Sequence, residues 1–251
     1  MISRDASIYC QSIFPPFSEK PCDNRVPRVE PLLPEHLDKA FESIDAAFKD
    51  DPLAQYLQAG KDRSPAEQTI YKRIWKFQHK RLLKRKAAYT VNGGDAAIIA
   101  TPPDADFGKP SPVDRTVDYI VSAIWNGLLW INRQQEQVKR YRELESKTRK
   151  IIENNLGDRV KSMVYIDLLA TNPESQGQGY GTVLLNTVLF SADIRGRAVF
   201  LTTGNTSNIP FYESFGFVHV THFFLGEENP KWDKPPLVVP LVSIASSYLQ
   251  N

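Results

Sequence analysis

Cysteine is scarce in this chain of 251 residues, which contains only Cys10 and Cys22. Two cysteines are too few for a disulfide framework. Neither has a nearby histidine or the Cys-x-x-Cys spacing that would suggest a nucleophile or a metal ligand. The sequence therefore predicts no metal site and favours a reduced, cytoplasmic protein.

Long apolar runs and an excess of one charge are also missing. No stretch of about 18 apolar residues occurs, which excludes a membrane-spanning helix. The first ten residues have no uninterrupted apolar core behind their charges, which argues against a secretory signal. The 31 basic and 29 acidic residues leave a formal net charge of +2. We therefore expect no overall nucleic-acid or membrane-surface role.

One segment, a helix expected over 64–87, is locally basic. Ser64 followed by Glu67 forms a capping box at its start. A nucleic-acid-binding helix would interleave aromatic residues with its basic residues. Here the aromatic residues belong to the apolar stripe expected to face inward, so the basic positions indicate a solvated face. That stripe is Ile70, Tyr71, Ile74, Trp75, Phe77 and Leu82.

The order of expected elements describes one domain over 26–251 behind an extension over 1–25. Proline and the lack of periodicity mark the extension, and a charged helical insertion is expected around 113–155. Pro240 favours an edge position or a bulge for the last strand. The expected strands are 26–33, 88–91, 96–101, 165–170, 198–203, 218–225 and 237–242, and the main helices are 34–48, 64–87, 113–155 and one that begins near 182.

The most informative stretch begins as a strand at Tyr165 and ends in three alternating glycines, Gly177, Gly179 and Gly181. Glycines let the backbone approach a ligand closely, and the free N–H groups of the following helix favour an anion. Neither a dinucleotide fingerprint nor a Gly-Lys-Ser/Thr loop is present. The pattern predicts a phosphate-binding loop. The alternative is a tight strand-to-helix connection that binds no ligand.

A second block follows the strand over 198–203. It contains Asn205, Asn208, the sequence Phe-Tyr212-Glu and the pair Gly216-Phe217. The two blocks are separated by a segment long enough for one helix, the one expected to begin near 182. Two motifs in this order are much harder to obtain by chance than either one.

Together the blocks resemble the GCN5-related N-acetyltransferase (GNAT) superfamily, in which a Gln/Arg-x-x-Gly-x-Gly/Ala motif grips the pyrophosphate of acetyl-CoA. The resemblance implies an α/β (α+β) GNAT fold. That fold is a mixed, mostly antiparallel sheet of about seven strands flanked by helices and splayed between the fourth and fifth strands. The sequence looks most similar to the small-molecule branch that includes puromycin N-acetyltransferase. However, Asp51 stands where that enzyme has an aromatic residue facing its acceptor.

The resemblance implies acetyl-CoA as co-substrate and assigns its contacts. Backbone groups of the splayed strand would meet the pantetheine arm, the glycine loop would hold the pyrophosphate, and Asn205 would reach the pantetheine. The expected cofactor-binding residues are Leu168, Leu169, Ala170, Gln176, Gly177, Gln178, Gly179, Tyr180, Gly181, Asn205 and Asn208.

Two catalytic residues are expected. The resemblance makes Tyr212 the acid that protonates the leaving thiolate, unless this tyrosine only packs its helix. Strand alternation places Asp167 on one face with Tyr165 and Leu169, and Val164, Ile166 and Leu168 on the other face. Because a carboxylate in an apolar strand is costly to bury unless it is paired, Asp167 is either the base or holder of the cationic acceptor, or a structural hydrogen-bond acceptor.

The resulting hypothesis is an enzyme that acetylates a small primary amine by direct attack on the thioester. A protein or peptide acetyltransferase and a non-catalytic acyl-CoA-binding module are the alternatives. We expect a monomer or a homodimer. The acceptor cavity is expected near Asp51, Tyr56, Trp125 and Asp167.

Overall fold

The computed structural model describes residues 27–58, 64–83, 86–107, 111–113, 115–117, 119–120, 123 and 135–245. The expectations for the extension over 1–25, for Cys10 and Cys22, and for Trp125 lie outside these residues. Over the described ranges, no helix combines the length and apolar character needed to cross a bilayer.

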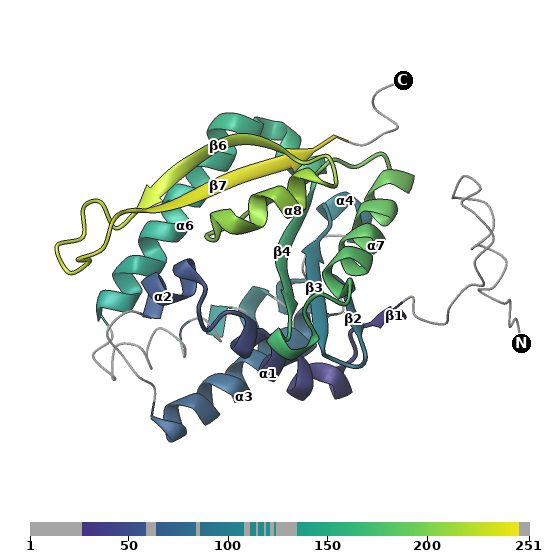
Figure 1. Ribbon diagram of the computed structural model, residues 1–251, viewed down its shortest axis with the longest axis horizontal. Helices are drawn as coiled ribbons and strands as arrows, with labels where there is room; N and C mark the ends of the chain where they lie inside the picture. Colours follow the sequence, from purple (N-terminus) through teal and green to yellow (C-terminus); the bar gives the residue numbers. More distant parts are fainter. Residues whose placement is uncertain are drawn as a thin grey trace, which may run out of the picture.

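A seven-stranded sheet forms the centre of the molecule (Figure 1). Its order is β1-β2-β3-β4-β5-β7-β6, and every neighbouring pair is antiparallel except β4 and β5, which are parallel. The mixed sheet expected from the sequence is thus confirmed. Its strands are β1 (Val29–Pro31), β2 (Ala87–Val91), β3 (Ala96–Thr101), β4 (Val164–Thr171), β5 (Val199–Thr202), β6 (Val218–Leu225) and β7 (Leu237–Ile244).

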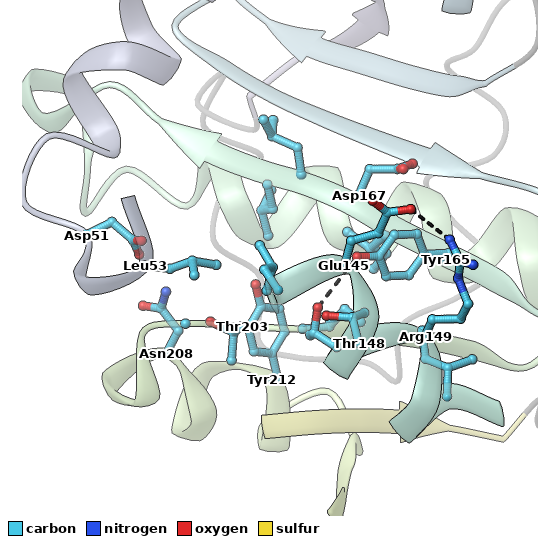
Figure 2. A pocket seen from close by; sticks show the side chains of 18 of the residues that line it. Asp51, Leu53, Glu145, Thr148, Arg149, Tyr165, Asp167, Thr203, Asn208 and Tyr212 are labelled. Carbon is cyan, nitrogen blue, oxygen red and sulfur yellow. Dashed lines mark hydrogen bonds and ion pairs between the residues drawn. The ribbon is translucent and has the colours of Figure 1, made fainter. Parts of the chain in front are cut away.

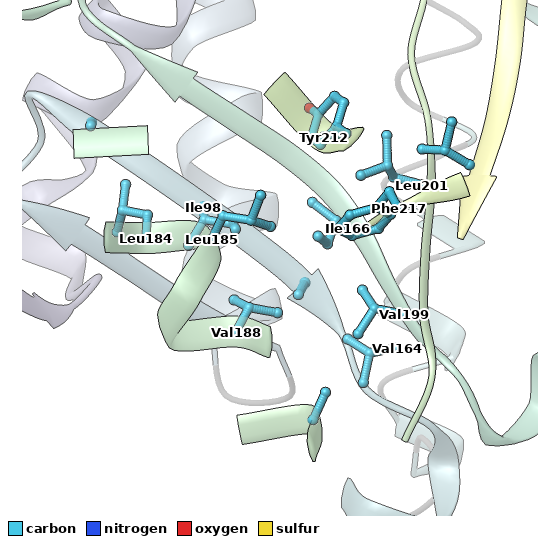
Figure 3. Packing of buried hydrophobic residues seen from close by; sticks show 14 of the residues in the cluster. Ile98, Val164, Ile166, Leu184, Leu185, Val188, Val199, Leu201, Tyr212 and Phe217 are labelled. Atoms are coloured by element: carbon cyan, nitrogen blue, oxygen red, sulfur yellow. The ribbon is translucent and has the colours of Figure 1, made fainter. Parts of the chain in front are cut away.

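Helices cover both faces of the sheet. In Figure 1, α7 and α8 lie in front of the sheet and α6 lies behind β6 and β7. Figure 3 shows the core on the α7 face, where Leu184, Leu185 and Val188 pack against strand residues such as Ile98 and Val164. The helical elements are η2 (Pro34–His36), α1 (Leu37–Ala47), α2 (Pro52–Gln58), α3 (Pro65–Leu82), α4 (Asp104–Phe107), α6 (Gln135–Leu156), η3 (Gly157–Ser162), η4 (Pro173–Ser175), α7 (Tyr180–Ile194), η5 (Thr206–Asn208) and α8 (Ile209–Glu213).

Local sequence signals set several element boundaries. The turn between β2 and β3 has positive φ at both Asn92 (52°) and Gly93 (62°), the conformation that an Asn-Gly hairpin adopts. The capping box before α3 is present, since the Ser64 N–H donates to Glu67 Oε2 at 2.9 Å. The expected inward stripe of α3 is only partly right, because Ile70 and Phe77 are exposed while the Trp75 ring packs on Phe41.

The expectation that Pro240 places its strand at an edge is wrong, because β7 lies between β5 and β6. The Pro240 carbonyl accepts a hydrogen bond from the Thr203 N–H at 3.2 Å. This contact lies one residue beyond Leu241–Thr202, the last residue pair of the β5–β7 ladder. The N and C=O of one strand residue point to the same side, so the nitrogen of Pro240 also faces β5. Its missing N–H therefore falls where this ladder has ended and costs no ladder hydrogen bond. The neighbouring register shift lies in β6.

A bulge in β4 overturns the expected alternation of its side chains. Ile99 pairs with Leu168 whereas Ala100 pairs with Ile166, so Asp167 is the extra residue. A bulge reverses the facing of every residue that follows it. Leu169 consequently joins Ile166 in the core under α7, and Leu168 packs on the opposite side, toward α1.

Candidate active site

The sheet opens between β4 and β5. These strands pair only at Val164–Val199 and Tyr165–Phe200, although β4 continues to Thr171 and β5 to Thr202. Beyond Tyr165 the edge of β4 that faces β5 has no strand partner in the described chain, while its other edge pairs with β3 from Tyr165 to Thr171. The backbone groups of 168–170 therefore lie where a second extended chain could bind.

The glycine loop leads from β4 into α7. Gly177 (φ 76°) and Gly179 (φ 78°) adopt the left-handed conformation, and a Cβ on either would meet nothing within 4 Å. Gly179 is the N-cap of α7. Within the described chain, none of the backbone N–H groups of 177–182 donates a hydrogen bond to a protein acceptor. The loop therefore presents free amides and open space at the positive end of a helix, as an anion-binding turn does.

Side chains fasten this loop to its surroundings. Gln176 Nε2 donates to the Thr171 carbonyl at 3.4 Å. The Tyr180 hydroxyl donates to Gln178 Oε1 at 2.8 Å and accepts from Asn92 Nδ2 at 2.9 Å, which joins the loop to the β2–β3 turn. Gln178 and Tyr180 therefore support the loop, while the backbone remains available to a ligand.

A cavity of about 790 Å³ lies beside the opening, between β4, β5, α6 and the connection from α1 to α2 (Figure 2). It brings together six residues expected from the sequence, namely Asp51, Asp167, Leu168, Leu169, Asn208 and Tyr212. The glycine loop, Ala170 and Asn205 are not part of its lining. The Asn205 side chain caps η5 by accepting from the Ser207 N–H at 3.1 Å.

Tyr212 lies at the cavity with its ring packed against Phe211 and Phe217. Burial, and after it the nearby Asp51 carboxylate, raises the pKa of Tyr212 to about 12. No described group forms a hydrogen bond with its hydroxyl. The side chain is thus a neutral phenol at physiological pH and has a proton to donate.

Asp51 is the carboxylate whose charge acts on Tyr212. It caps α2 by accepting from the Ala54 N–H at 2.9 Å, and it lines the same cavity. Burial raises the pKa of Asp51 above its ordinary value. A half-buried carboxylate with a raised pKa in a cavity is a candidate proton acceptor. The resemblance placed Asp51 near the acceptor cavity, but no local sequence signal indicated a role for it in proton transfer.

Asp167 also lines the cavity, but its two oxygens are engaged. Oδ1 pairs with the Lys86 ammonium at 2.7 Å, and Oδ2 accepts from Thr101 Oγ1 at 2.6 Å. The three residues come from the segment before β2, from β4 and from β3. This geometry favours the structural alternative, in which Asp167 holds the bulge of β4 in place.

Tyr56 does not form part of the cavity. It is fully buried, its hydroxyl donates to Glu143, and the Arg140 guanidinium lies 4.9 Å from its ring centre. Arg140, only 2% exposed, also donates to the Tyr56 carbonyl at 2.6 Å and to the Lys231 carbonyl at 3.2 Å. These contacts fasten α6, which contains most of the described residues of the expected insertion, to α2 and to the β6–β7 connection, so that α6 forms one wall of the cavity.

Residues 143–219 match the family model described as the acetyltransferase (GNAT) domain. This part of the chain is therefore similar to GNAT acetyltransferase domains. An uncharacterised N-acetyltransferase of Schizosaccharomyces pombe is 30% identical over 67 residues, which are 27% of this chain and 27% of that relative. The match to this curated relative thus spans about a quarter of its length.

Solved structures show that the likeness extends to the GNAT fold. Arylalkylamine N-acetyltransferase 2 of Aedes aegypti aligns with a TM-score of 0.58 at 16% identity, over 87% of this chain and 98% of that chain. Polyamine N-acetyltransferase of Drosophila melanogaster aligns with a TM-score of 0.53 at 11% identity, over 87% and 99%. At these identities the comparison establishes the fold, and with it the expected splayed sheet.

The described residues near the sheet opening have features that suit acetyl-CoA, the donor that GNAT acetyltransferases use. The open space over Gly177 and Gly179 and the free amides of the loop suit a pyrophosphate. The unpaired edge of β4 suits the amide groups of pantetheine. The two features follow each other along the chain, which matches the order of these groups in the ligand.

Proposed function

We propose that the protein is an N-acetyltransferase that transfers the acetyl group of acetyl-CoA to a small primary amine. One observation carries this proposal. The opening between β4 and β5 has an amide-lined loop at one end and, beside it, a cavity that contains both a neutral phenol and a half-buried carboxylate.

When bound, acetyl-CoA supplies an activated acetyl group and a thiol leaving group. The protein must then remove a proton from the ammonium form of the acceptor and provide one to the leaving sulfur. Asp51 is suited to the first task because burial raises its pKa and makes it a better proton acceptor. Tyr212 is suited to the second because its hydroxyl is protonated and has no described partner. No nucleophile of the protein is required.

Asp167 remains the second candidate for the base. Its predicted role requires that it receive a proton while paired with Lys86 and Thr101. The alternative role, electrostatic and structural, requires no titration. The pH dependence of the reaction separates the two, because only the loss of the base removes the acidic limb of the rate profile.

The acceptor class is suggested by the cavity and by the names of the structural neighbours. The described residues that line the cavity include four carboxylates, Asp51, Glu145, Glu153 and Asp167, and one arginine, Arg149, which suits a cationic amine. The two neighbours above are named for arylalkylamines and for polyamines. A closer relation to the puromycin-acetylating branch stays a prediction, as do a cytoplasmic location and a monomeric or homodimeric state.

The test is the appearance of free thiol when the purified protein is incubated with acetyl-CoA and one amine at a time. The panel contains an arylalkylamine, agmatine, spermidine and peptides with a free amino terminus. We expect thiol release with small amines and little with peptides. A preference for peptides would support the protein-acetyltransferase alternative. Calorimetric CoA binding without thiol release would support the non-catalytic module.

A further inference from the structure

Among the hydroxyl groups that line the cavity, three come from three different elements and lie on its α6 side. They belong to Thr148 on α6, Tyr165 on β4 and Thr202 on β5. In the view of Figure 2, Thr148 and Tyr165 lie on the side of Tyr212 opposite to Asp51. The site of proton transfer and these hydroxyls thus lie toward different ends of one cavity. Along β4 the lining runs from Tyr165 to Leu169, a span of roughly 13 Å at 3.3 Å per residue.

The hydrogen-bonding capacity of these hydroxyls is little used. The Tyr165 hydroxyl reaches Thr202 Oγ1 at 3.5 Å, which is long for a bond between two hydroxyls. Thr148 Oγ1 is buried and has no hydrogen-bond partner in the described chain. A buried hydroxyl without a partner is unfavourable. A rotation of the Thr148 side chain to another staggered rotamer exchanges Oγ1 with its methyl group and can turn the hydroxyl toward a ligand.

The charged groups near this end are either paired or exposed to solvent. Glu145 and Arg149 form an ion pair of 2.7 Å, and Asp167 is held by Lys86. Tyr141 and Glu153, which also line the cavity from α6, are exposed to solvent, whereas Leu144, Ile152 and Val160 are apolar. Burial raises the pKa of Tyr165, so its phenol is neutral at physiological pH. This end of the cavity therefore suits a neutral polar group better than a second cation.

We infer that Thr148, Tyr165 and Thr202 form a hydroxyl subsite that binds a neutral hydrogen-bonding group at the far end of the acceptor. The acceptor class is then an amine joined through an apolar body to a phenol or alcohol, and not a diamine. The inference rests on the proposed acetyltransferase function and narrows its substrate class.

The test compares three amines that differ at the far end: tyramine, phenethylamine and agmatine. For each amine, kcat/KM is measured from thiol release, and the Kd is measured by calorimetry with CoA present. One hydrogen bond between neutral groups corresponds to about a tenfold change at the upper end of its range. We expect the wild-type protein to prefer tyramine over phenethylamine by about tenfold and to bind agmatine most weakly.

Two variants remove hydroxyls while keeping side-chain volume. Tyr165→Phe preserves the ring that packs on Phe200 at 5.0 Å between centroids, and Thr148→Val replaces a hydroxyl that has no described partner. We expect each variant to reduce the preference for tyramine severalfold while the value for phenethylamine changes by less than about threefold. Thr187→Val is the control, because the Thr187 hydroxyl bonds to the Val183 carbonyl within α7, away from the cavity lining. Thermal denaturation shows whether each variant is folded.

The outcomes separate the subsite from the proposed activity. Selective binding of tyramine without thiol release supports the subsite and contradicts the acetyltransferase function. Thiol release with equal rates for tyramine and phenethylamine overturns the subsite and leaves the activity standing. A preference for agmatine, absence of tyramine binding, or an unchanged preference in both cavity variants also overturns the subsite.

Discussion

A glutamate at Gly179 should abolish the binding of CoA, because it places a side chain and a negative charge in the free-amide turn at the start of α7. Gly179 has φ of 78°, and its absent Cβ points into open space. The left-handed conformation costs a non-glycine residue roughly 1–2 kcal/mol, which lowers stability but leaves the protein folded. A unit charge about 5 Å from a phosphate charge costs about 3 kcal/mol at an effective dielectric constant of 20, or roughly a hundredfold in affinity.

The chain offers a matched control at the other end of the same helix. Gly196 also has positive φ (61°), and its Cβ would also meet nothing within 4 Å. The 15 residues of α7 separate the two glycines by about 22 Å, more than twice the screening length at physiological salt. Gly196→Glu should therefore lose similar stability and keep wild-type affinity. Gly179→Gln, which lacks the charge, should lie between the wild type and Gly179→Glu.

Isothermal titration of CoA measures the affinities, and thermal denaturation measures the stabilities. We expect no detectable heat with Gly179→Glu at concentrations that saturate the wild type and Gly196→Glu. Wild-type affinity in a folded Gly179→Glu protein would refute the assignment of this turn to the pyrophosphate. An equal loss in Gly196→Glu would show that destabilisation, and not the local charge, is responsible.

Four further predictions concern the cavity. Tyr212→Phe should lower kcat by about a hundredfold while the Kd of CoA is kept, and a kcat within twofold of wild type would exclude an acid role. Asp51→Asn should remove the acidic limb of the pH–rate profile, whereas Asp167→Asn should keep it; the reverse pattern would make Asp167 the base. Burial raises the pKa of Asp51, so the contribution of this residue to stability falls as the pH rises through that pKa. Asp51→Asn should therefore melt at a higher temperature than the wild type at pH 7. This difference should disappear near pH 4, the ordinary pKa of Asp. Gly204→Ala would place a Cβ 2.2 Å from the Leu53 Cβ, so it should cost about 1–3 kcal/mol by denaturant unfolding and raise the KM of the amine; wild-type values would contradict the packing there.

Features that depend on local conformation were predictable from the residue order. The Asn-Gly hairpin, the capping box before α3 and the strand that enters the glycine loop lie where the sequence predicts them. Gly177 and Gly179 adopt the positive φ that makes glycine necessary in such a loop. In each case a few neighbouring residues restrict the backbone to one region of φ and ψ, so the signal does not depend on the rest of the fold.

Features that depend on register were not predictable. The bulge at Asp167 exchanges the faces of Leu168 and Leu169, because the register between β3 and β4 shifts by one residue between Ile99 and Ala100. Pro240 is accommodated in an inner strand, since its missing N–H falls where the ladder to β5 ends. Neither outcome can be derived from the strand concerned, because each depends on the alignment of a neighbouring strand.

The sequence by itself determined the kind of loop that begins α7 and the presence of a tyrosine in the short helix that follows β5, because glycine conformation and helix spacing are local properties. Only the tertiary structure placed Asp51 beside Tyr212, turned Tyr56 into the core, and made α6 a wall of the cavity with the Thr148 hydroxyl buried in it. These relations join residues far apart in the chain, and the packing of helices on the sheet decides which of them meet.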